Sequence, residues 1–364
     1  MSIAGEKQNL NLVQVLRGVA SLLVVFYHAT INSNDVLNKE FLFNSFMSGY
    51  SGVDIFFVLS GFIITYTGLK NYSQPGKMQL FVRRRLVRIY PTYWIIISLF
   101  LFSQLVLPAF YKTPFDFSFS NVLSTYLLWP YHVMVNGVSW TLSFELFFYL
   151  LFLLVFILPS KKWAFAVFAI YTAVIILVSI TGLYKDFTQG MKFVFHPVNV
   201  EFFMGVLSAL IISKIPGRAG LAFIILGTVL LIVAMVLNNA GMFIFENDFN
   251  RVVLFGIPSF MLIAGVVAYE ISFKVRTHNI FLRLGEASYS LYLMHLPIVA
   301  AFVRLYPKLN IDNDFVYHAL FLILIAVICY ASVLFFRLIE KPIIARLNAG
   351  FKKSNNLKVA GRTN

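Results

Sequence analysis

Residues 11–31 read NLVQVLRGVASLLVVFYHATI, a mostly apolar run that is interrupted by Arg17 and carries His28 near its end. A helix needs roughly 20 mostly apolar residues to cross the hydrocarbon core of a bilayer, and this run is that long. Because Arg17 breaks the run and no small-residue cleavage site follows it, the pattern differs from that of a cleaved signal peptide. We therefore predict a retained transmembrane helix here.

The composition of the whole chain agrees with this first run. The 364 residues are 60% hydrophobic and 12% charged, whereas a soluble domain is about 45–50% apolar and about 25% charged. Too few charges remain to cover a water-exposed surface, which excludes a sizeable soluble domain. The single cysteine, Cys329, excludes an intrachain disulfide. The sequence predicts a polytopic membrane protein.

Ten runs in the chain are long and apolar enough to span a bilayer. They lie near residues 11–31, 49–69, 89–109, 138–158, 163–182, 197–213, 219–237, 252–271, 285–305 and 315–338. A further apolar stretch, Asn121–His132, is too short to cross and ends in Trp129-Pro130, so we predict a re-entrant or interfacial helix. The expected fold is an all-α integral membrane protein with about ten transmembrane helices plus this short one. We assign residues 1–340 to one membrane domain and residues 341–364 to a basic, disordered cytoplasmic tail.

The basic residues predict the orientation of these spans. The chain holds 29 Lys and Arg against 15 Asp and Glu, a net charge of +14. With the N-terminus inside and the short helix not crossing, 21 of the 29 basic residues fall in inner segments and 7 in outer segments. Cytoplasmic loops of membrane proteins carry such an excess. We therefore predict ten crossings with both termini cytoplasmic, and the excess of basic residues requires no nucleic-acid partner.

Ionisable side chains inside the predicted spans are candidates for function, because they are costly to place in a bilayer. They are Arg17, His28, Asp54, Glu145, Glu201 and His295. Arg17 and His28 are about 20° apart around a helix and about 16 Å apart along it, so they share one face. On the predicted topology the carboxylates Asp54 and Glu145 lie at a depth similar to that of His28, where one of them would orient the imidazole as a general base.

Structural roles remain open for the same residues. His28 also fits a hydrogen-bonded residue at the membrane interface, and Arg17 also fits a side chain that snorkels to the inner headgroups. Asp54 follows Ser51-Gly52-Val53, which is typical of a helix N-cap region. Glu201 lies close to His196-Pro197 and is better explained as a carboxylate at a helix start.

A second group of candidates lies at the cytoplasmic start of the third span. Four arginines gather there, Arg83, Arg84, Arg85 and Arg88, and Arg85 and Arg88 share a helix face. Guanidinium groups bind phosphates in a bidentate manner, although the cluster also fits a topology signal or a site for anionic lipid. The chain has no P-loop or dinucleotide glycine pattern, no Cys/His set with metal-ligand spacing and no Gly-x-Ser-x-Gly. We therefore expect no metal site.

Six sequence blocks occur in the order of a known family. They are Leu16-Arg17-Gly18-Val19-Ala20 with His28, then GVDIFFVLSGF (52–62), RLVRIYP (85–91), SWTLSFELFFY (139–149), SYSLYLMHLP (288–297) and RLIEKP (337–342). Over residues 9–343 the chain resembles the acyltransferase-3 family of bacterial membrane O-acyltransferases, which includes exopolysaccharide and O-antigen acetylases. Each block is weak alone, and the six together are specific.

The resemblance implies a multi-pass enzyme of the bacterial inner membrane. It would move an acyl group, usually acetyl, from cytoplasmic acyl-CoA to a hydroxyl of a cell-surface or lipid-linked glycan. Acetyl-CoA would be a co-substrate and no cofactor would be bound permanently. The implied partners are acyl-CoA, the glycan acceptor, membrane lipids and glycan-assembly machinery. Some relatives carry an additional extracytoplasmic domain that completes the transfer, and this chain would act alone or with a separate partner.

The resemblance also assigns roles to the candidate residues. It implies that His28 is catalytic, as a general base or through transient acylation, and that Arg85 and Arg88 bind CoA with Arg83 and Arg84 beside them. We expect Glu145 or Asp54 to orient His28, and Arg17 to line the path of the pantetheine arm. The candidate substrate-binding residues are Trp140, Tyr289, Ser290 and His295, of which the last three are candidate oxyanion donors. Alternative functions are a carrier or flippase for a lipid-linked sugar, or a scaffold without chemistry.

Overall fold

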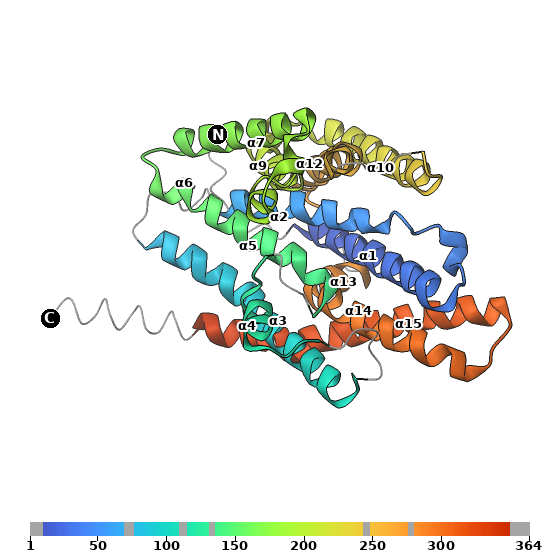
Figure 1. Ribbon diagram of the computed structural model, residues 1–364. Coiled ribbons are helices and arrows are strands. Elements are labelled where there is room, and N and C mark those ends of the chain that lie inside the picture. The colour runs from blue at the N-terminus through green and yellow to red at the C-terminus, as the bar shows by residue number, and fades with distance from the viewer. Residues whose placement is uncertain are drawn as a thin grey trace. The chain divides into compact units, whose positions relative to one another are not determined.

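The computed structural model (Figure 1) describes residues 10–68, 76–108, 115–130, 135–242, 248–275 and 280–349. These residues form helices joined by short turns and contain no strand, which confirms the all-α prediction. Ten helices among them are long and apolar enough to cross a membrane. They are Asn11–Leu37, Gly49–Gly68, Lys77–Val106, Gly137–Ile157, Lys161–Thr181, Gln189–Lys214, Gly217–Asn239, Phe249–Phe273, Ser288–Leu309 and Asp314–Ala349. Each predicted span has its helix, so the chain is a multi-pass membrane protein.

The residues that we assigned to one membrane domain divide into two compact units. Unit 1 comprises Met1–Ile31, Lys39–Lys70 and Phe165–Ser288, and unit 2 comprises Asn32–Asn38, Asn71–Ala164 and Tyr289–Asn364. Each unit is therefore built from segments that are distant in the sequence, and α1 (Asn11–Leu37) and α7 (Lys161–Thr181) each contribute to both.

The other helices of unit 1 are α2 (Gly52–Gly68), α8 (Gln189–Val194), α9 (Asn199–Ile211), α10 (Gly217–Asn239), α11 (Asp248–Arg251), α12 (Ile257–Phe273) and α13 (Ile280–Glu286). Short turns of 3-10 helix are η1 (Phe41–Asn44), η2 (Gly49–Ser51), η6 (Leu183–Asp186) and η7 (Ile212–Lys214), and η8 (Val252–Gly256) is π-helical. In unit 2 the helices are α3 (Lys77–Val106), α4 (Phe119–Leu127), α5 (Trp140–Phe152), α6 (Leu154–Ile157), α14 (Ser288–Leu305) and α15 (Asp314–Phe335), with the turns η5 (Gly137–Ser139) and η9 (Tyr306–Leu309) and the π-helical η10 (Phe336–Glu340).

Glycines set the closest helix contacts of unit 1. A Cβ atom at Gly61 on α2 would lie 1.9 Å from the carbonyl oxygen of Phe202 on α9, and one at Gly205 would lie 2.0 Å from the carbonyl oxygen of Val58. The two backbones therefore touch where these glycines cross. Small residues allow such close packing between helices in a membrane, where the lipid gives no hydrophobic drive for association. The crossing places the starts of α2 and α9 in one unit with the charged residues described below.

The short helix predicted near Asn121–His132 is present as α4, and the structure describes this stretch up to Pro130. The last four carbonyl groups of a helix lack partners within it, and here side chains of α3 and α5 supply them. The bonds run from Tyr93 Oη to Thr125 O (2.8 Å), Trp94 Nε1 to Tyr126 O (3.0 Å), Tyr90 Oη to Leu127 O (3.2 Å) and Ser143 Oγ to Leu128 O (2.7 Å). Protein neighbours thus shelter the end of α4, as a re-entrant helix would require. Its insertion into the membrane stays a prediction, as does the orientation of both termini.

The predicted tail begins later than we expected. The last helix continues to Ala349, so residues 341–349 are helical and not disordered. Its sequence, KPIIARLNA, contains good helix formers after the single Pro342, which explains why the helix continues past the charged residues. Residues 350–364 of the predicted tail lie outside the described residues.

Candidate active site

Arg17 and His28 lie on one uninterrupted helix, α1, as their spacing predicted. Both side chains are half-buried in unit 1. Arg17 Nη1 donates to Gln14 Oε1 over 3.4 Å, and its own carbonyl oxygen accepts a hydrogen bond from Ser21 Oγ over 2.9 Å. The Arg17 side chain therefore contacts a polar neighbour on its own helix, one turn closer to the N-terminus.

The hydrogen bond of His28 decides which ring nitrogen can act as a base. Its Nδ1 lies 3.0 Å from the carbonyl oxygen of Val24, one turn earlier in α1. A carbonyl oxygen only accepts, so Nδ1 must carry the proton in this bond. In the neutral ring the lone pair then resides on Nε2. The helix backbone itself thus fixes the tautomer in which Nε2 can take a proton.

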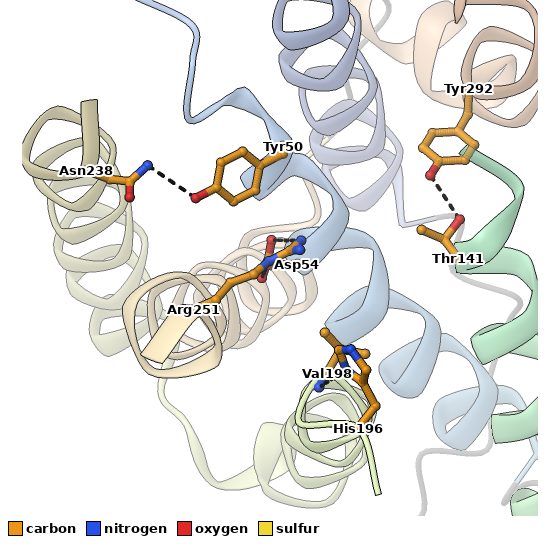
Figure 2. Close-up of polar contacts among 8 residues, drawn as sticks. All are labelled: Tyr50, Asp54, Thr141, His196, Val198, Asn238, Arg251 and Tyr292. Atoms are coloured by element: carbon orange, nitrogen blue, oxygen red, sulfur yellow. Dashed lines mark hydrogen bonds and ion pairs between the residues drawn. The ribbon is translucent and has the colours of Figure 1, made fainter. Parts of the chain in front are cut away.

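Asp54 lies in the first turn of α2, fully buried, and its partner is Arg251 (Figure 2). Arg251 Nε donates to Asp54 Oδ1 over 3.0 Å, and Arg251 Nη2 donates to Asp54 Oδ2 over 2.8 Å. This is the bidentate arrangement that makes arginine–carboxylate pairs strong and directional. Both Asp54 oxygens are thus engaged by Arg251, whereas we expected this carboxylate to cap α2 or to orient His28. Arg251 was missed because its position at the start of the eighth span resembled a loop cation.

A row of aromatic side chains in contact with one another connects this ion pair to His28 within unit 1. The Arg251 guanidinium lies 5.0 Å from the centre of the Tyr50 ring. Tyr50 meets Tyr27 edge to face at 5.4 Å, and Tyr27 meets the His28 ring edge to face at 4.9 Å. The Tyr50 hydroxyl also accepts a hydrogen bond of 3.2 Å from Asn238 Nδ2 on α10 (Figure 2). The ion pair and the imidazole therefore pack against one continuous surface.

In unit 2 the arginine cluster lies on α3, and Arg88 is held most firmly. Arg88 Nη1 donates to Glu340 Oε1 over 2.5 Å, and its guanidinium lies 5.3 Å from the centre of the Tyr289 ring. Glu340 is fully buried, and its second oxygen accepts a hydrogen bond of 2.5 Å from Ser290 Oγ. Glu340 was missed as a site residue although it lies in the RLIEKP block, because its pairing with Arg88 joins positions 252 residues apart.

The other three arginines have different surroundings. The Arg85 guanidinium lies 5.5 Å from the ring centre of Phe81 and 5.7 Å from that of Tyr149. Tyr149 in turn donates a hydrogen bond of 2.5 Å to Glu145 Oε1. Arg83 donates to the carbonyl oxygen of Leu347, and Arg84 is exposed. The structure thus joins Arg85 and Glu145 through one tyrosine, a link that the sequence did not reveal.

The hydroxyl groups proposed as oxyanion donors are already engaged. Tyr289 donates to the carbonyl oxygen of Ile89 over 2.9 Å, and Ser290 donates to Glu340. These contacts fit a structural role better than oxyanion stabilisation, because an oxyanion donor must already point at the place where charge develops, whereas these hydroxyls point at protein acceptors. His295 is fully buried with Nδ1 3.1 Å from the carbonyl oxygen of Leu291, which repeats the geometry of His28.

The remaining candidate, Trp140, lies at the start of α5 in unit 2. Trp140 begins α5 and meets the Phe144 ring edge to face at 5.7 Å. Next to it, Thr141 Oγ1 and the Tyr292 hydroxyl are 2.9 Å apart (Figure 2). The described residues contain no group of three or more His, Cys, Asp and Glu side chains that is close enough to hold a metal ion.

Comparison with known proteins identifies the family of the chain. Residues 11–337 match the acyltransferase domain of the acyltransferase-3 family. The chain belongs to this family. The match covers every candidate site residue predicted from the sequence and confirms the family resemblance, although the last block, residues 337–342, lies beyond its end except for Arg337.

Three relatives are similar to this chain over most of its length. The chain is 26% identical to the exopolysaccharide production protein ExoZ of Rhizobium meliloti (strain 1021) over 268 residues, which cover 69% of this chain and 76% of that protein. It is 28% identical to nodulation protein 10 of Rhizobium leguminosarum bv. viciae over 338 residues, which cover 83% and 85%. A Staphylococcus aureus (strain COL) protein named "Putative O-acetyltransferase" is 26% identical over 376 residues, which cover 90% of this chain and 56% of that protein. This chain therefore spans a little over half the length of the staphylococcal relative. No solved structure gives a significant match.

Proposed function

We propose that this membrane acyltransferase moves an acetyl or other acyl group from acyl-CoA to a hydroxyl of a cell-surface or lipid-linked glycan, in the bacterial inner membrane. The observation that carries the proposal is the hydrogen bond from His28 Nδ1 to the Val24 carbonyl oxygen, because it leaves Nε2 as the acceptor. The names of two relatives refer to exopolysaccharide production and to O-acetyl transfer, which supports a sugar hydroxyl as acceptor.

The arginines of α3 support acyl-CoA as donor. Arg85 and Arg88 lie one turn apart on one helix, and each guanidinium rests on an aromatic ring. The ion pair with Glu340 fixes the position of Arg88. A guanidinium that is held in advance loses less entropy when it binds a phosphate, so such a pair suits the phosphates of CoA. On the predicted topology this end of α3 faces the cytoplasm, where acyl-CoA is found.

The proposed reaction is a direct transfer. The acceptor hydroxyl oxygen attacks the thioester carbonyl carbon while His28 Nε2 takes the hydroxyl proton. The carbon–sulfur bond then breaks, and the proton passes from His28 to the CoA thiolate. Since Nδ1 keeps its bond to the Val24 carbonyl, the imidazolium that forms between these steps stays oriented. Orientation of His28 by Glu145 and transient acylation of His28 stay predictions within this scheme.

Replacement of His28 tests the proposal. We expect His28→Ala to lower the rate of acetylation about 10²–10⁴-fold, because a positioned general base contributes that much. The measurement is the acetyl content of surface polysaccharide, by mass spectrometry, in a deletion strain that expresses the variant at the wild-type level. In membranes from the same strains, acetylation should require added acetyl-CoA.

The matched control is His196→Ala. His196 belongs to the same unit and accepts a hydrogen bond of 3.3 Å from the Val198 amide through Nδ1 (Figure 2), so its role is to hold a turn. We expect this variant to acetylate at close to the wild-type rate. Full acetylation by His28→Ala would refute the mechanism. Movement of a lipid-linked sugar without any acyl donor would instead favour a carrier.

A further inference from the structure

Glu201 is a fully buried acidic residue that the proposed mechanism does not use. It lies in the first turn of α9, it is fully buried, and no N–H or O–H group of the described residues donates to either of its carboxyl oxygens. The ionisable groups that act on this carboxyl group are the carboxyl group of Asp54 and the guanidinium of Arg251. A Cβ atom at Gly256 would lie 3.2 Å from Glu201 Oε1, so the carboxyl group also packs tightly against η8.

The pairing of these two carboxyl groups determines where a proton must be. Glu201 is fully buried with no donor directed at either oxygen, and an ionised carboxylate left in that way would be very costly beside a second buried carboxylate, so one of the pair carries a proton. Asp54 already accepts two charge-assisted hydrogen bonds from Arg251 and is the partner stabilised as an anion. One guanidinium also balances only one negative charge in a buried site. Both arguments assign the proton to Glu201.

We propose that Glu201 is a neutral carboxylic acid in the resting protein and that it is a positioning residue, which donates a hydrogen bond to Asp54 and thereby fixes the Asp54–Arg251 pair behind His28. Arg251 lies on the Tyr50 ring, Tyr50 packs on Tyr27, and Tyr27 packs on the imidazole. Loosening the ion pair therefore loosens the surface on which the imidazole rests. The positioning role rests on the proposed function, whereas the protonation of Glu201 does not.

Infrared spectroscopy of the full-length protein in lipid nanodiscs tests the protonation directly. We expect the wild-type minus Glu201→Gln difference spectrum to contain the C=O stretching band of a protonated carboxyl group. The matched control is Glu270→Gln, because Glu270 is also buried in unit 1 but accepts the Leu12 amide over 3.0 and 3.1 Å as a carboxylate would. Its difference spectrum should contain carboxylate bands only. A Glu201→Gln spectrum with carboxylate bands and no protonated band would overturn the proposal.

Acetylation by two Glu201 variants tests the positioning role. The amide of Glu201→Gln can still donate to Asp54, so we expect its kcat to stay within about threefold of wild type. Glu201→Leu fills the space without a donor, so we expect kcat to fall at least tenfold with the KM for acetyl-CoA unchanged. Equal losses in both variants would overturn the role of a neutral donor, and full activity of Glu201→Leu would overturn positioning.

The two proposals fail in distinguishable ways. If the wild-type protein shows no acetylation that depends on acetyl-CoA, the proposed function is wrong while the infrared result for Glu201 still decides its protonation. Thermal unfolding of Glu201→Leu in detergent, compared with that of the wild type, shows whether the variant is folded. A folded variant with reduced kcat supports the positioning role, and a folded variant with wild-type kcat contradicts it.

Discussion

In the part of the chain that the structure describes, each unit contains an ion pair between residues of membrane-spanning helices. Asp54 pairs with Arg251 in unit 1, and Arg88 pairs with Glu340 in unit 2. The side chains of Asp54 and Glu340 are fully buried, whereas those of Arg251 and Arg88 are 15% and 28% exposed. Removing charges from water costs several kcal/mol per ion, and a pair of this kind is weak support for stability in itself. Their presence is better explained by function, with the arginine held ready in one place.

The Arg88–Glu340 pair gives a prediction at this scale. Glu340→Ala leaves the Arg88 charge and the Ser290 hydroxyl without their partner, which we expect to destabilise the protein by about 3 kcal/mol, the lower end of the range for buried pairs. The double variant Arg88→Leu/Glu340→Leu removes both charges and should recover much of this stability. The measurement is thermal unfolding in detergent, together with binding of acetyl-CoA to the purified protein.

Stability and donor binding should separate in this series. We expect the double variant to bind acetyl-CoA as poorly as Arg88→Ala, because the proposed phosphate ligand is absent from both. If the double variant binds acetyl-CoA as tightly as the wild type, the pair is structural and the arginines of α3 do not hold the donor. If Glu340→Ala unfolds at the wild-type temperature, the pair does not stabilise unit 2.

Both ion pairs involve π-helical turns, which is the main observation at the scale of elements. Arg251 directly precedes η8, and Glu340 is the last residue of η10. A π-helical turn inserts one residue into the α-helical register, and such turns occur mostly at functional positions. The side chains that follow or precede the turn are rotated relative to a regular helix. The π-helical turns η8 and η10 thus each position one charged residue, Arg251 in unit 1 and Glu340 in unit 2.

The crossing of α2 and α9 allows a test of packing at the same scale. Gly61→Ala would place its Cβ atom 1.9 Å from the Phe202 carbonyl oxygen, which is backbone and cannot rotate away. The helices must separate, and overpacking of this kind costs about 1–3 kcal/mol. We expect a lower unfolding temperature and reduced acetylation, because Asp54 and Glu201 are brought together by the same two helices. Gly190→Ala is the control, since nothing lies within 4 Å of its Cβ position. An unchanged unfolding temperature for Gly61→Ala would contradict the packing.

Features that depend only on a segment's own residues could be predicted from the sequence. Each span must be apolar over its own length to lie in a bilayer, so all ten runs could be found without knowledge of their neighbours. The same holds for Arg17 and His28, which share one helix. The partner of Asp54 was not predictable, because Arg251 is 197 residues away and the contact depends on how α2 and η8 pack. The split into two units has the same origin, since each unit joins distant segments.

At the scale of the whole molecule, the orientation of the chain in the membrane is open to a direct test. Lys162 lies in the first turn of α7 and Lys185 lies in η6, just after the other end of α7; both are exposed, and one membrane crossing separates them. With the N-terminus inside and α4 not crossing, four spans precede α7, which places Lys162 inside and Lys185 outside. The single native cysteine is replaced first, as Cys329→Ser, and Lys162→Cys or Lys185→Cys is then introduced.

The expected result is that a membrane-impermeant thiol reagent labels the Lys185→Cys variant in intact cells, and the Lys162→Cys variant only after the membrane is permeabilised. A full crossing by α4 would exchange the two sides, and so would an extracellular N-terminus. An epitope tag at the N-terminus, detected before and after permeabilisation, distinguishes these two cases. If the labelling is inverted and the tag is inside, α4 is an eleventh span. If the labelling is inverted and the tag is outside, the Arg83–Arg88 cluster does not face the cytoplasm. The basis for a cytoplasmic acyl-CoA donor is then lost.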